Sequence, residues 1–247
     1  MSIWVLSDLH LAVGNPSKDM CVFGPSWAGY MDKIEKNWRS CIQEEDLVLI
    51  PGDISWASTL EQAKIDLAWI HALPGTKVII KGNHDYWWAS NAKMDAALPS
   101  SIHYIYNNAF QWKDVTLGGS RLWDTEEYNF TPFIEFVENP RERKENKTSL
   151  EEDQKIFQKE LERLRRSLEC LNPKASLRIA LVHYPPISAN LEPSKASSLL
   201  QEFHVDICVF GHLHSVKEQS LPFGTKDGVR YVFASADYLA FMPLKTL

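Results

Sequence analysis

The sequence predicts an α/β fold. Three observations support this prediction: five short apolar runs end in polar turns, helical patterns lie between them, and the composition is ordinary for a globular protein, with 45% hydrophobic and 23% charged residues. Short continuous apolar runs are typical of strands that are buried on both faces. Strands that alternate with helical segments favour an α/β core.

The predicted strands follow from the apolar runs in chain order. Five runs that lead into polar turns lie at residues 3–6, 47–50, 78–80, 179–182 and 207–210. Further strands with short connections are expected at residues 102–106, 110–112, 115–117 and 229–234. Together they predict a sheet-rich core with most strands buried.

Helical patterns connect these strands. Three segments are expected to be helices, at residues 30–43, 59–71 and 193–203. Ser58 is the expected N-cap of the second helix, because Glu61 follows it at the spacing of a capping box.

A charged segment at residues 139–170 differs from the rest of the chain. It holds nine Lys or Arg and eight acidic residues, and its apolar positions recur at three and four, which predicts an amphipathic helix. We expect one domain over residues 1–247, with 139–171 as a charged helical insertion within it. A solvated surface helix is the expected role of this segment, and a lid or a partner-binding surface is the alternative.

Composition and charge limit the classes of function. With 26 Lys and Arg against 32 Asp and Glu, the formal charge is −6, which argues against a general nucleic-acid coat and a polybasic membrane binder. The first residues lack the basic region of a signal peptide, and no run approaches the roughly 18 apolar residues of a membrane-spanning helix, so we expect a cytoplasmic protein. The cysteines form no close pair, and we expect buried free thiols, at Cys21, Cys41, Cys170 and Cys208.

Five of the eight histidines lie in the turns at strand ends. The carboxyl ends of parallel strands converge at one edge of a sheet, where α/β proteins bind their ligands. We therefore expect the polar residues of these turns to meet in space. They are Asp8, His10, Asp53, Asn83, His84, Asp85, His183, His212 and His214.

This collection of side chains predicts a metal site. Neutral imidazole nitrogens and carboxylate oxygens suit divalent ions such as Zn, Mn and Fe. The set exceeds the four ligands of one tetrahedral site, so two ions held roughly 3.5–4 Å apart by a bridging carboxylate can share it. In the extended segment Asp8-Leu9-His10, both flanking side chains can face one ion.

The series of motifs resembles that of the calcineurin-like metallophosphoesterases. Its members here are Asp8-Leu9-His10, Gly52-Asp53, Gly82-Asn83-His84-Asp85, His183 and Gly211-His212-Leu213-His214. The resemblance spans residues 8–214, and no ligand of the family pattern is missing. It implies a four-layer α/β/β/α sandwich of two mixed sheets flanked by helices. It also implies two divalent metal ions, with Mn preferred over Fe, Zn, Co or Ni.

Carried over residue by residue, the resemblance implies two sets of metal ligands. One ion would take Asp8, His10, Asp53 and His214. The other would share Asp53 and would also take Asn83, His183 and His212. His84 would stand beside the substrate without binding metal, and Asp85 would orient it.

The resemblance implies a mechanism as well. Two dications would lower the pKa of a shared water, and the resulting bridging hydroxide would attack a phosphate mono- or diester. The ions would also stabilise the charge on the phosphoryl oxygens. His84 would donate a proton to the leaving oxygen or stabilise its charge, and Asp85 would raise the pKa of His84 and fix its tautomer.

Three residues near the motifs are candidate substrate contacts. Trp56 and Trp87 lie close in sequence to the metal turns, and a base stacked on either would favour a nucleotide-like substrate. Core packing is the alternative for both. Arg121 follows two glycines at a strand end, from where it would reach a phosphate. Pairing with a nearby acid is the alternative for this arginine.

Several functions stay open at this point. A phosphatase or phosphodiesterase that acts on a small phosphate ester or a nucleotide-like substrate is the first. A nuclease is the second, and the acidic charge without a basic stripe disfavours it. A metal-binding scaffold without turnover is the third, and the complete ligand set argues against it. Composition also leaves phosphoprotein phosphatase activity open.

Overall fold

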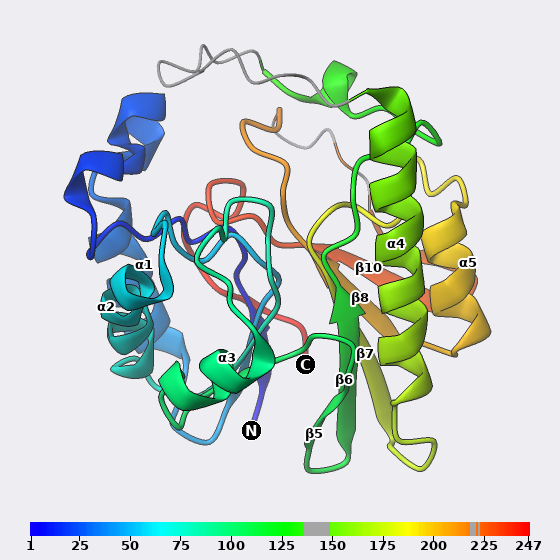
Figure 1. The fold of residues 1–247 in the computed structure, drawn as a ribbon, viewed down its shortest axis with the longest axis horizontal. Coiled ribbons are helices and arrows are strands. Elements are labelled where there is room, and N and C mark those ends of the chain that lie inside the picture. Colours follow the sequence, from blue (N-terminus) through cyan, green and yellow to red (C-terminus); the bar gives the residue numbers. More distant parts are fainter. Residues whose placement is uncertain (136–148, 218–220, 222) are drawn as a thin grey trace.

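A computed structural model describes residues 1–135, 149–217, 221 and 223–247 of the chain. Two mixed β-sheets pack against each other in it, and helices cover the outer face of each sheet (Figure 1). The first sheet is covered by α1 (Tyr30–Cys41), α2 (Leu60–His71) and α3 (Asn91–Ala97). The second is covered by α4 (Leu150–Glu169) and α5 (Lys195–Glu202). The α/β class and the four layers that the sequence led us to expect are confirmed.

The first sheet has five strands in the order β11-β1-β2-β3-β4. Four of them run parallel to one another, and β11 pairs antiparallel with β1 at one edge. The strands are β1 (Ile3–Val5), β2 (Leu47–Ile50), β3 (Thr76–Ile79), β4 (Ile102–Tyr104) and β11 (Leu244–Lys245).

The second sheet has six strands in the order β5-β6-β7-β8-β10-β9. Its inner four strands are parallel, and the two edge strands, β5 and β9, are antiparallel to their neighbours. The strands are β5 (Phe110–Trp112), β6 (Val115–Ser120), β7 (Leu177–Val182), β8 (Ile207–Phe210), β9 (Thr225–Lys226) and β10 (Val229–Phe233). The connections also contain 3-10 turns, at Pro16–Lys18, Met20–Phe23, Pro25–Trp27 and Thr131–Phe133.

The core consists of three apolar layers, one between the sheets and one under each set of helices. Successive side chains of β2 alternate between two of these layers. Leu47 and Leu49 pack between the sheets, whereas Val48 and Ile50 pack under the helices of the first sheet. Both faces of such a strand are buried, which is why the strands are continuous apolar runs in the sequence.

The start of α2 differs from the sequence prediction. The N-cap is Thr59 rather than Ser58, and its side chain accepts a hydrogen bond from the backbone N–H of Gln62. Ser58 instead donates its backbone N–H to the side chain of Gln62. The helix α3 was not predicted, because its seven residues are too short to show a period of their own.

The prediction of buried thiols is correct only for Cys208, although all four cysteines are free. Cys21 and Cys170 are exposed, and Cys41 is partly buried. Cys21 lies in a surface 3-10 turn, and Cys170 caps the end of α4. Neither place gives the side chain a core-facing position.

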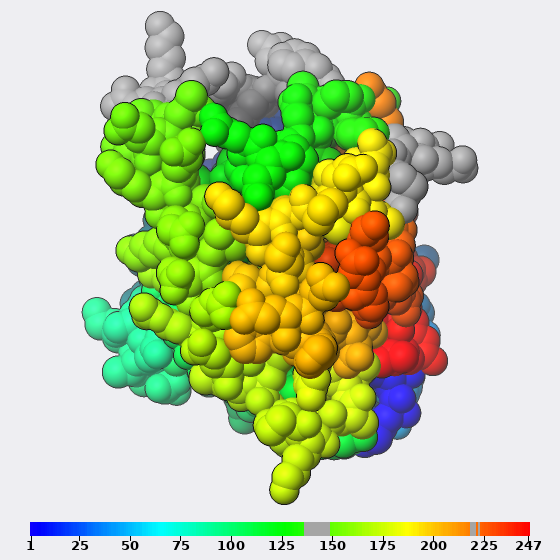
Figure 2. All heavy atoms as spheres, turned by 90° about the vertical axis from the view of Figure 1, so that its right-hand side faces the viewer, coloured from blue at the N-terminus to red at the C-terminus, as the bar shows by residue number. Residues whose placement is uncertain are grey.

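The charged segment supplies one outer layer of the sandwich. Apolar residues of α4, among them Phe157, Leu161 and Leu164, pack on the second sheet. Its Ser167 hydroxyl accepts a hydrogen bond of 2.7 Å from the backbone N–H of Gly119 in β6. Figure 2 shows α4 and α5 side by side over this face. The part of the predicted insertion at residues 139–148 lies outside the described residues.

Within the described part of the chain, no helix combines the length and the apolar character that crossing a membrane requires.

Candidate metal centre

The polar turns after five parallel strands meet at one end of the sandwich. The segments after β1 and β2 run side by side there, because the backbone N–H groups of Asp8 and His10 donate to the carbonyls of Gly52 and Asp53 at 3.1 and 3.0 Å. The turn after β8 joins them, since its His212 N–H donates to the Asp8 carboxylate at 3.0 Å. Local backbone pairing therefore holds the sequence motifs together.

One group of candidate ligands gathers around His10. The Nε2 atoms of His10 and His214 lie 3.0 Å apart, and His214 Nε2 lies 3.7 Å from a carboxylate oxygen of Asp8. Asp8, His10 and His214 can place one ligand atom each within 4.8 Å of one another. Two imidazole nitrogens and a carboxylate oxygen thus point to a common place.

A second group gathers around His183. Its Nε2 atom lies 2.6 Å from Asn83 Oδ1 and 3.5 Å from Asp53 Oδ1. His212 Nδ1 lies 3.1 Å from the same Asn83 oxygen. The other carboxylate oxygen of Asp53 lies 3.7 Å from His10 Nε2 in the first group. Asp53 therefore stands between the two groups with one oxygen toward each.

Four of these residues hold a left-handed backbone conformation, with φ values of 59° for Asp8, 45° for His10, 51° for Asp53 and 73° for His212. This region is uncommon for residues other than glycine and is found at sites where the surrounding structure imposes it. In this conformation the chain turns sharply after each strand, and the polar side chain is directed into the site.

Glycines of the motifs leave room for the candidate ligands. A Cβ on Gly82 would lie 2.1 Å from Asp53 Oδ1, and one on Gly211 would lie 2.1 Å from Asp8 Oδ2. At Gly52, a Cβ would lie 2.6 Å from the His183 ring. These distances are too short for any side chain, so the glycines allow the carboxylates and the ring to approach the neighbouring backbone.

Asp8, His10, Asp53 and His183 are buried, with 0% of Asp8 and 1% of Asp53 exposed, whereas Asn83, His212 and His214 are partly buried. Burial raises the pKa of Asp8. Burial acts in the same direction on Asp53, but the neighbouring histidines, His183 above all, together outweigh it, and the pKa of Asp53 falls well below its ordinary value. A buried carboxylate requires a compensating positive charge close by.

The histidines divide into two kinds. Burial lowers the pKa of His10 and of His212 well below its ordinary value, which favours neutral imidazole with a free lone pair. Burial also disfavours the charged forms of His183 and His214. Adjacent aspartate carboxylates outweigh it and raise the pKa of each to about 9. A cation placed among these groups would replace the protons on the two basic imidazoles, because metal ligands bind in their deprotonated form.

Sequence reasoning missed the groups that orient these ligands. The carboxylate of Asp237 lies 3.0 Å from His214 Nδ1 and also accepts the backbone N–H of Ser215. The hydroxyl of Ser235 donates to Asp8 Oδ2 at 2.9 Å. Both residues lie just after β10, so a search for polar residues at that strand end would have found them. Carboxylate and hydroxyl partners of this kind fix the orientation of ligating groups.

The carboxylate of Asp85 makes several contacts that the sequence did not predict. Its carboxylate accepts backbone N–H groups from Ile54, Ser55 and Gly82 at 2.8–3.2 Å, and the indole N–H of Trp87 at 2.9 Å. Through these contacts Asp85 fastens the turn after β2 to the turn after β3. Its expected role in orienting His84 stays a proposal.

His84 lies at the edge of a cleft of about 350 Å³ beside the candidate ligands His10 and His214. The ring of Trp56 stacks on His10 with centroids 5.0 Å apart and lies 4.6 Å from the ring of His84. Trp56 is therefore placed where a substrate contact was expected. A second cleft, of about 430 Å³, reaches the other side of the site at His212.

The positions of Trp87 and Arg121 do not fit the expected substrate contacts. Trp87 is 2% exposed and packs in the core under the first sheet, where its indole bonds to Asp85. The Arg121 guanidinium pairs with the buried carboxylate of Glu160 at 3.3 Å. It lines neither of the two clefts beside the candidate ligands.

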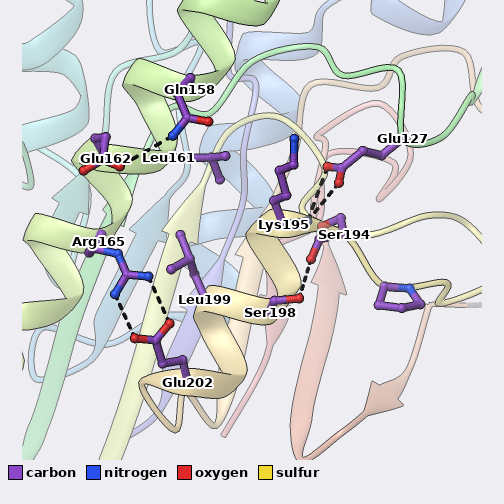
Figure 3. A pocket seen from close by; sticks show the side chains of 11 residues that line it. Glu127, Gln158, Leu161, Glu162, Arg165, Ser194, Lys195, Ser198, Leu199 and Glu202 are labelled. Atoms are coloured by element: carbon purple, nitrogen blue, oxygen red, sulfur yellow. Dashed lines mark hydrogen bonds and ion pairs between the residues drawn. The ribbon is translucent and has the colours of Figure 1, made fainter.

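A larger cavity, of about 540 Å³, lies between α4 and α5 and contains none of the expected site residues. Figure 3 shows that its charged groups are largely paired within it. Arg165 binds Glu202 through two hydrogen bonds of 2.8 and 3.0 Å, and Glu127 accepts the backbone N–H of Lys195. We find no group there that matches the chemistry of the sequence motifs.

The chain is similar to several known proteins. A model of the calcineurin-like phosphoesterase family matches residues 1–216. Gene 66 protein of Mycobacterium phage D29 is 35% identical over 85 residues, which are 34% of this chain and 40% of that protein. Its counterpart in Mycobacterium phage L5 is 36% identical over 88 residues, which are 33% of this chain and 39% of that protein. The matches span about two fifths of the length of these relatives.

Solved structures are similar to this chain at low sequence identity. Phosphopantetheinyl hydrolase (PptH) from Mycobacterium tuberculosis gives a TM-score of 0.54 at 14% identity, over 100% of this chain and 95% of that chain. The calcineurin-like phosphoesterase YfkN from Bacillus subtilis gives a TM-score of 0.48 at 15% identity, over 96% and 82% of the respective chains. Since the family model matches most of the sequence and includes all five motifs, the chain belongs to the calcineurin-like phosphoesterase family, a family of metal-dependent phosphoester hydrolases.

Proposed function

We propose that this chain hydrolyses phosphate mono- or diesters with the help of two divalent metal ions. The position of Asp53 is the observation that supports this most directly. One of its carboxylate oxygens faces His10 at 3.7 Å and the other faces His183 at 3.5 Å. A carboxylate between two imidazoles from different turns is suited to bridging two ions.

The proposed ligand sets are those that the family resemblance implies. One comprises Asp8, His10, Asp53 and His214, and the other comprises Asp53, Asn83, His183 and His212. These residues fit a pair of cations, because buried and partly buried nitrogen and oxygen donors converge from five turns and the motif glycines leave the space that they need. When bound, the ions would lower the pKa of a water and neutralise charge on the phosphoryl oxygens.

We propose that His84 acts on the leaving group. Its backbone N–H donates to Asp53 Oδ1 at 2.9 Å, which fixes its place relative to the proposed bridge. Its ring lines the same cleft as His10 and His214. From there it can donate a proton to the leaving oxygen or stabilise the charge that develops on it.

The cleft beside His84 supports a substrate whose alcohol portion is aromatic. Its described walls include the apolar side chains of Met20, Phe23, Trp27 and Trp56. Aromatic faces of this kind stack on aryl rings and on nucleobases. We therefore propose a small aryl or nucleotide-like phosphate ester as the substrate class.

A screen of metals against substrates tests the proposed function. The whole chain would be stripped with a chelator and reloaded with Mn, Co, Ni, Zn or Mg. It would then be assayed on an aryl phosphate monoester, an aryl diester, cyclic nucleotides and pyrophosphate. We expect turnover of an aryl or nucleotide ester with at least one of these ions and none without metal.

Other results of this screen would overturn the proposal. Absence of turnover with every ion would favour a scaffold that binds metal without catalysis, and efficient cleavage of DNA or RNA would favour a nuclease. The variant Trp56→Ala should raise KM for the aryl ester more than for an alkyl phosphate. An equal change for both would contradict the stacking role of Trp56.

A further inference from the structure

A separate cavity of about 180 Å³ lies where the ends of β3, β4 and β6 meet α4. None of the proposed metal ligands lines it. Its polar and charged lining residues come from four segments of the chain, and they are Lys81, Asn107, Ser120, Arg121, Glu160 and Arg163. The volume is well above the roughly 10–15 Å³ that a single water requires.

The lining of this cavity carries an excess of positive charge. Three cationic residues, Lys81, Arg121 and Arg163, line the cavity together with one acidic residue, Glu160, which is 2% exposed. A single oxygen of Glu160 accepts both arginines, at 3.3 Å from Arg121 and 2.5 Å from Arg163. Lys81 makes no hydrogen bond or ion pair to any of the residues described in the structure. Three basic residues and one acidic residue give the lining a formal net charge of +2.

Aromatic rings hold the two guanidinium groups in place. Arg163 lies over the ring of Tyr106 at 5.1 Å, and Arg121 lies over the ring of Trp123 at 4.4 Å. Stacking on a face leaves the N–H edge of a guanidinium available for a second acceptor. The arginines are also shielded from solvent, with 18% of the Arg121 side chain and 24% of the Arg163 side chain exposed.

Two buried polar atoms belong to residues that line the same cavity. The indole Nε1 of Trp88 and the side-chain oxygen of Asn107 are buried and have no hydrogen-bond partner among the described residues. Buried polar groups in native proteins are normally satisfied, so such atoms indicate an additional partner. A half-turn of the Asn107 amide would present its NH₂ group in place of the oxygen.

We propose that this cavity binds a small tetrahedral oxyanion of the phosphate or sulfate type. Water alone would satisfy the two orphaned atoms, but it would leave the partly buried net charge uncompensated, which is costly. A dianion would balance that charge and accept hydrogen bonds from the arginines, Lys81 and the Trp88 indole. Guanidinium groups suit oxyanions in particular, because their paired N–H donors match two oxygens.

The anion site would be linked to the candidate metal centre through the backbone. Lys81 precedes the proposed ligand Asn83 by two residues. The carbonyl of Arg121 accepts the backbone N–H groups of His183 and Tyr184 at 3.2 and 3.0 Å. An anion held by Lys81 and Arg121 would therefore restrain the two segments that position Asn83 and His183.

Binding of inorganic phosphate to the metal-free whole chain tests the proposal. In isothermal titration calorimetry we expect Arg163→Gln to weaken binding by about tenfold or more, because a charge-assisted hydrogen bond is lost. The matched control is Arg166→Gln, on the same helix but exposed and away from the cavity, and it should bind like the unchanged chain. Sulfate should compete with phosphate.

Two further variants separate binding from loss of structure. Trp88→Phe keeps an aromatic ring but removes the N–H donor together with part of the indole, so it should weaken phosphate binding while the circular dichroism spectrum stays unchanged. Glu160→Gln removes the competing negative charge and should tighten binding. If Glu160→Gln leaves affinity unchanged or lowers it, the charge argument is wrong.

Absence of phosphate binding, or equal affinities of Arg163→Gln and Arg166→Gln, would overturn the anion site. Binding that appears only after metal is added and disappears in Asp53→Asn would place the phosphate at the metal centre and would also overturn it. Because the titration of the metal-free chain contains no ester substrate, its result is independent of whether the proposed hydrolysis occurs.

Discussion

Asp53 combines three properties that few residues share. It has a left-handed backbone, its side chain is buried, and its two carboxylate oxygens face imidazoles from different turns. The strained backbone aims the carboxylate, and the Gly82 position leaves room for it. At the scale of single residues, the site therefore depends on a side chain that no other residue can replace in both length and charge.

Asp53→Asn should remove at least one metal ion per chain and lower turnover by more than about 100-fold, since an amide offers one oxygen in place of two and carries no charge. Elemental analysis of the purified variant measures the metal. Asp32→Asn, an exposed change on α1, is the control. Retention of two tightly bound ions in Asp53→Asn would refute the bridging role.

His84→Ala should keep both ions and lower turnover by about 10²–10⁴-fold, because general acid catalysis contributes that much. His71→Ala, at the exposed end of α2, is the control variant. Metal content and kcat are measured on the same preparation. Loss of metal in His84→Ala would mean that this histidine is a ligand.

At the scale of elements, the turn after β3 is held by one buried carboxylate. Asp85 accepts three backbone N–H groups and one indole N–H, and it thereby fixes the segment that carries Asn83 and His84 against the turn that carries Asp53. The turn is rigid because a buried acceptor satisfies donors from both segments. Gly82 belongs to the same turn, and its backbone N–H is one of the groups that Asp85 accepts.

Gly82→Ala should abolish metal binding and destabilise the fold. The new Cβ would lie 2.1 Å from Asp53 Oδ1 and 2.2 Å from the Asp53 backbone nitrogen, and overpacking of this kind costs about 1–3 kcal/mol. Gly118→Ala in β6 is the matched control, since its nearest contacts are side-chain atoms at 3.1 Å. Chemical denaturation and metal analysis compare the two. A Gly82→Ala chain with unchanged metal content would contradict the steric argument.

Lys77 in β3 makes the stability of the fold depend on pH. Its side chain is fully buried and donates to the carbonyl of Leu73, and burial lowers its pKa to about 8. The unfolded chain, with an ordinary pKa of 10.5, binds more protons between about pH 8 and 10.5, so stability rises with pH in that window.

The substitution Lys77→Met should therefore change the free energy of unfolding more favourably at pH 7 than at pH 10. Its free energy of unfolding relative to the unchanged chain should fall by up to about 1.4 kcal/mol for each pH unit in that window. Urea denaturation at several pH values measures this difference. Lys36→Met, which changes an exposed lysine on α1, is the control. A difference that does not vary with pH would show that Lys77 keeps an ordinary pKa.

At the scale of the whole molecule, the two sheets bring together side chains from Asp8 to Asp237 at one end of the sandwich. Several of these are buried carboxylates and imidazoles with mutually dependent charges. Their burial destabilises the metal-free protein unless protons or cations compensate the charge. Metal binding is thus coupled to the stability of the complete fold.

Removal of metal with a chelator should lower the melting temperature. Free ions at about one hundred times their dissociation constant stabilise a fold by about 2.7 kcal/mol, which corresponds to roughly 5–10 °C for a domain of this size. Differential scanning calorimetry with and without chelator measures the shift, and Asp53→Asn should show a smaller one. Equal melting temperatures with and without chelator would indicate that no metal is held by the folded chain.

The sequence by itself determined the α/β class, most strands and helices, and the candidate ligands from Asp8 to His214. These features follow from local patterns, since an apolar run, a glycine and a polar turn are written in consecutive residues. The family model confirms the assignment of the chain that the motifs predicted. The individual roles of the ligands stay proposals.

Only the tertiary structure decided how the surrounding side chains are used. Asp85 fastens two turns, Trp87 is buried, Arg121 pairs with Glu160, and Asp237 contacts His214. Each of these features depends on segments that are distant in the sequence and close in space. The local sequence does not show that they are close. Their partners are set by the way the two sheets and their helices pack, because burial and electrostatic pairing act between groups that are close in space.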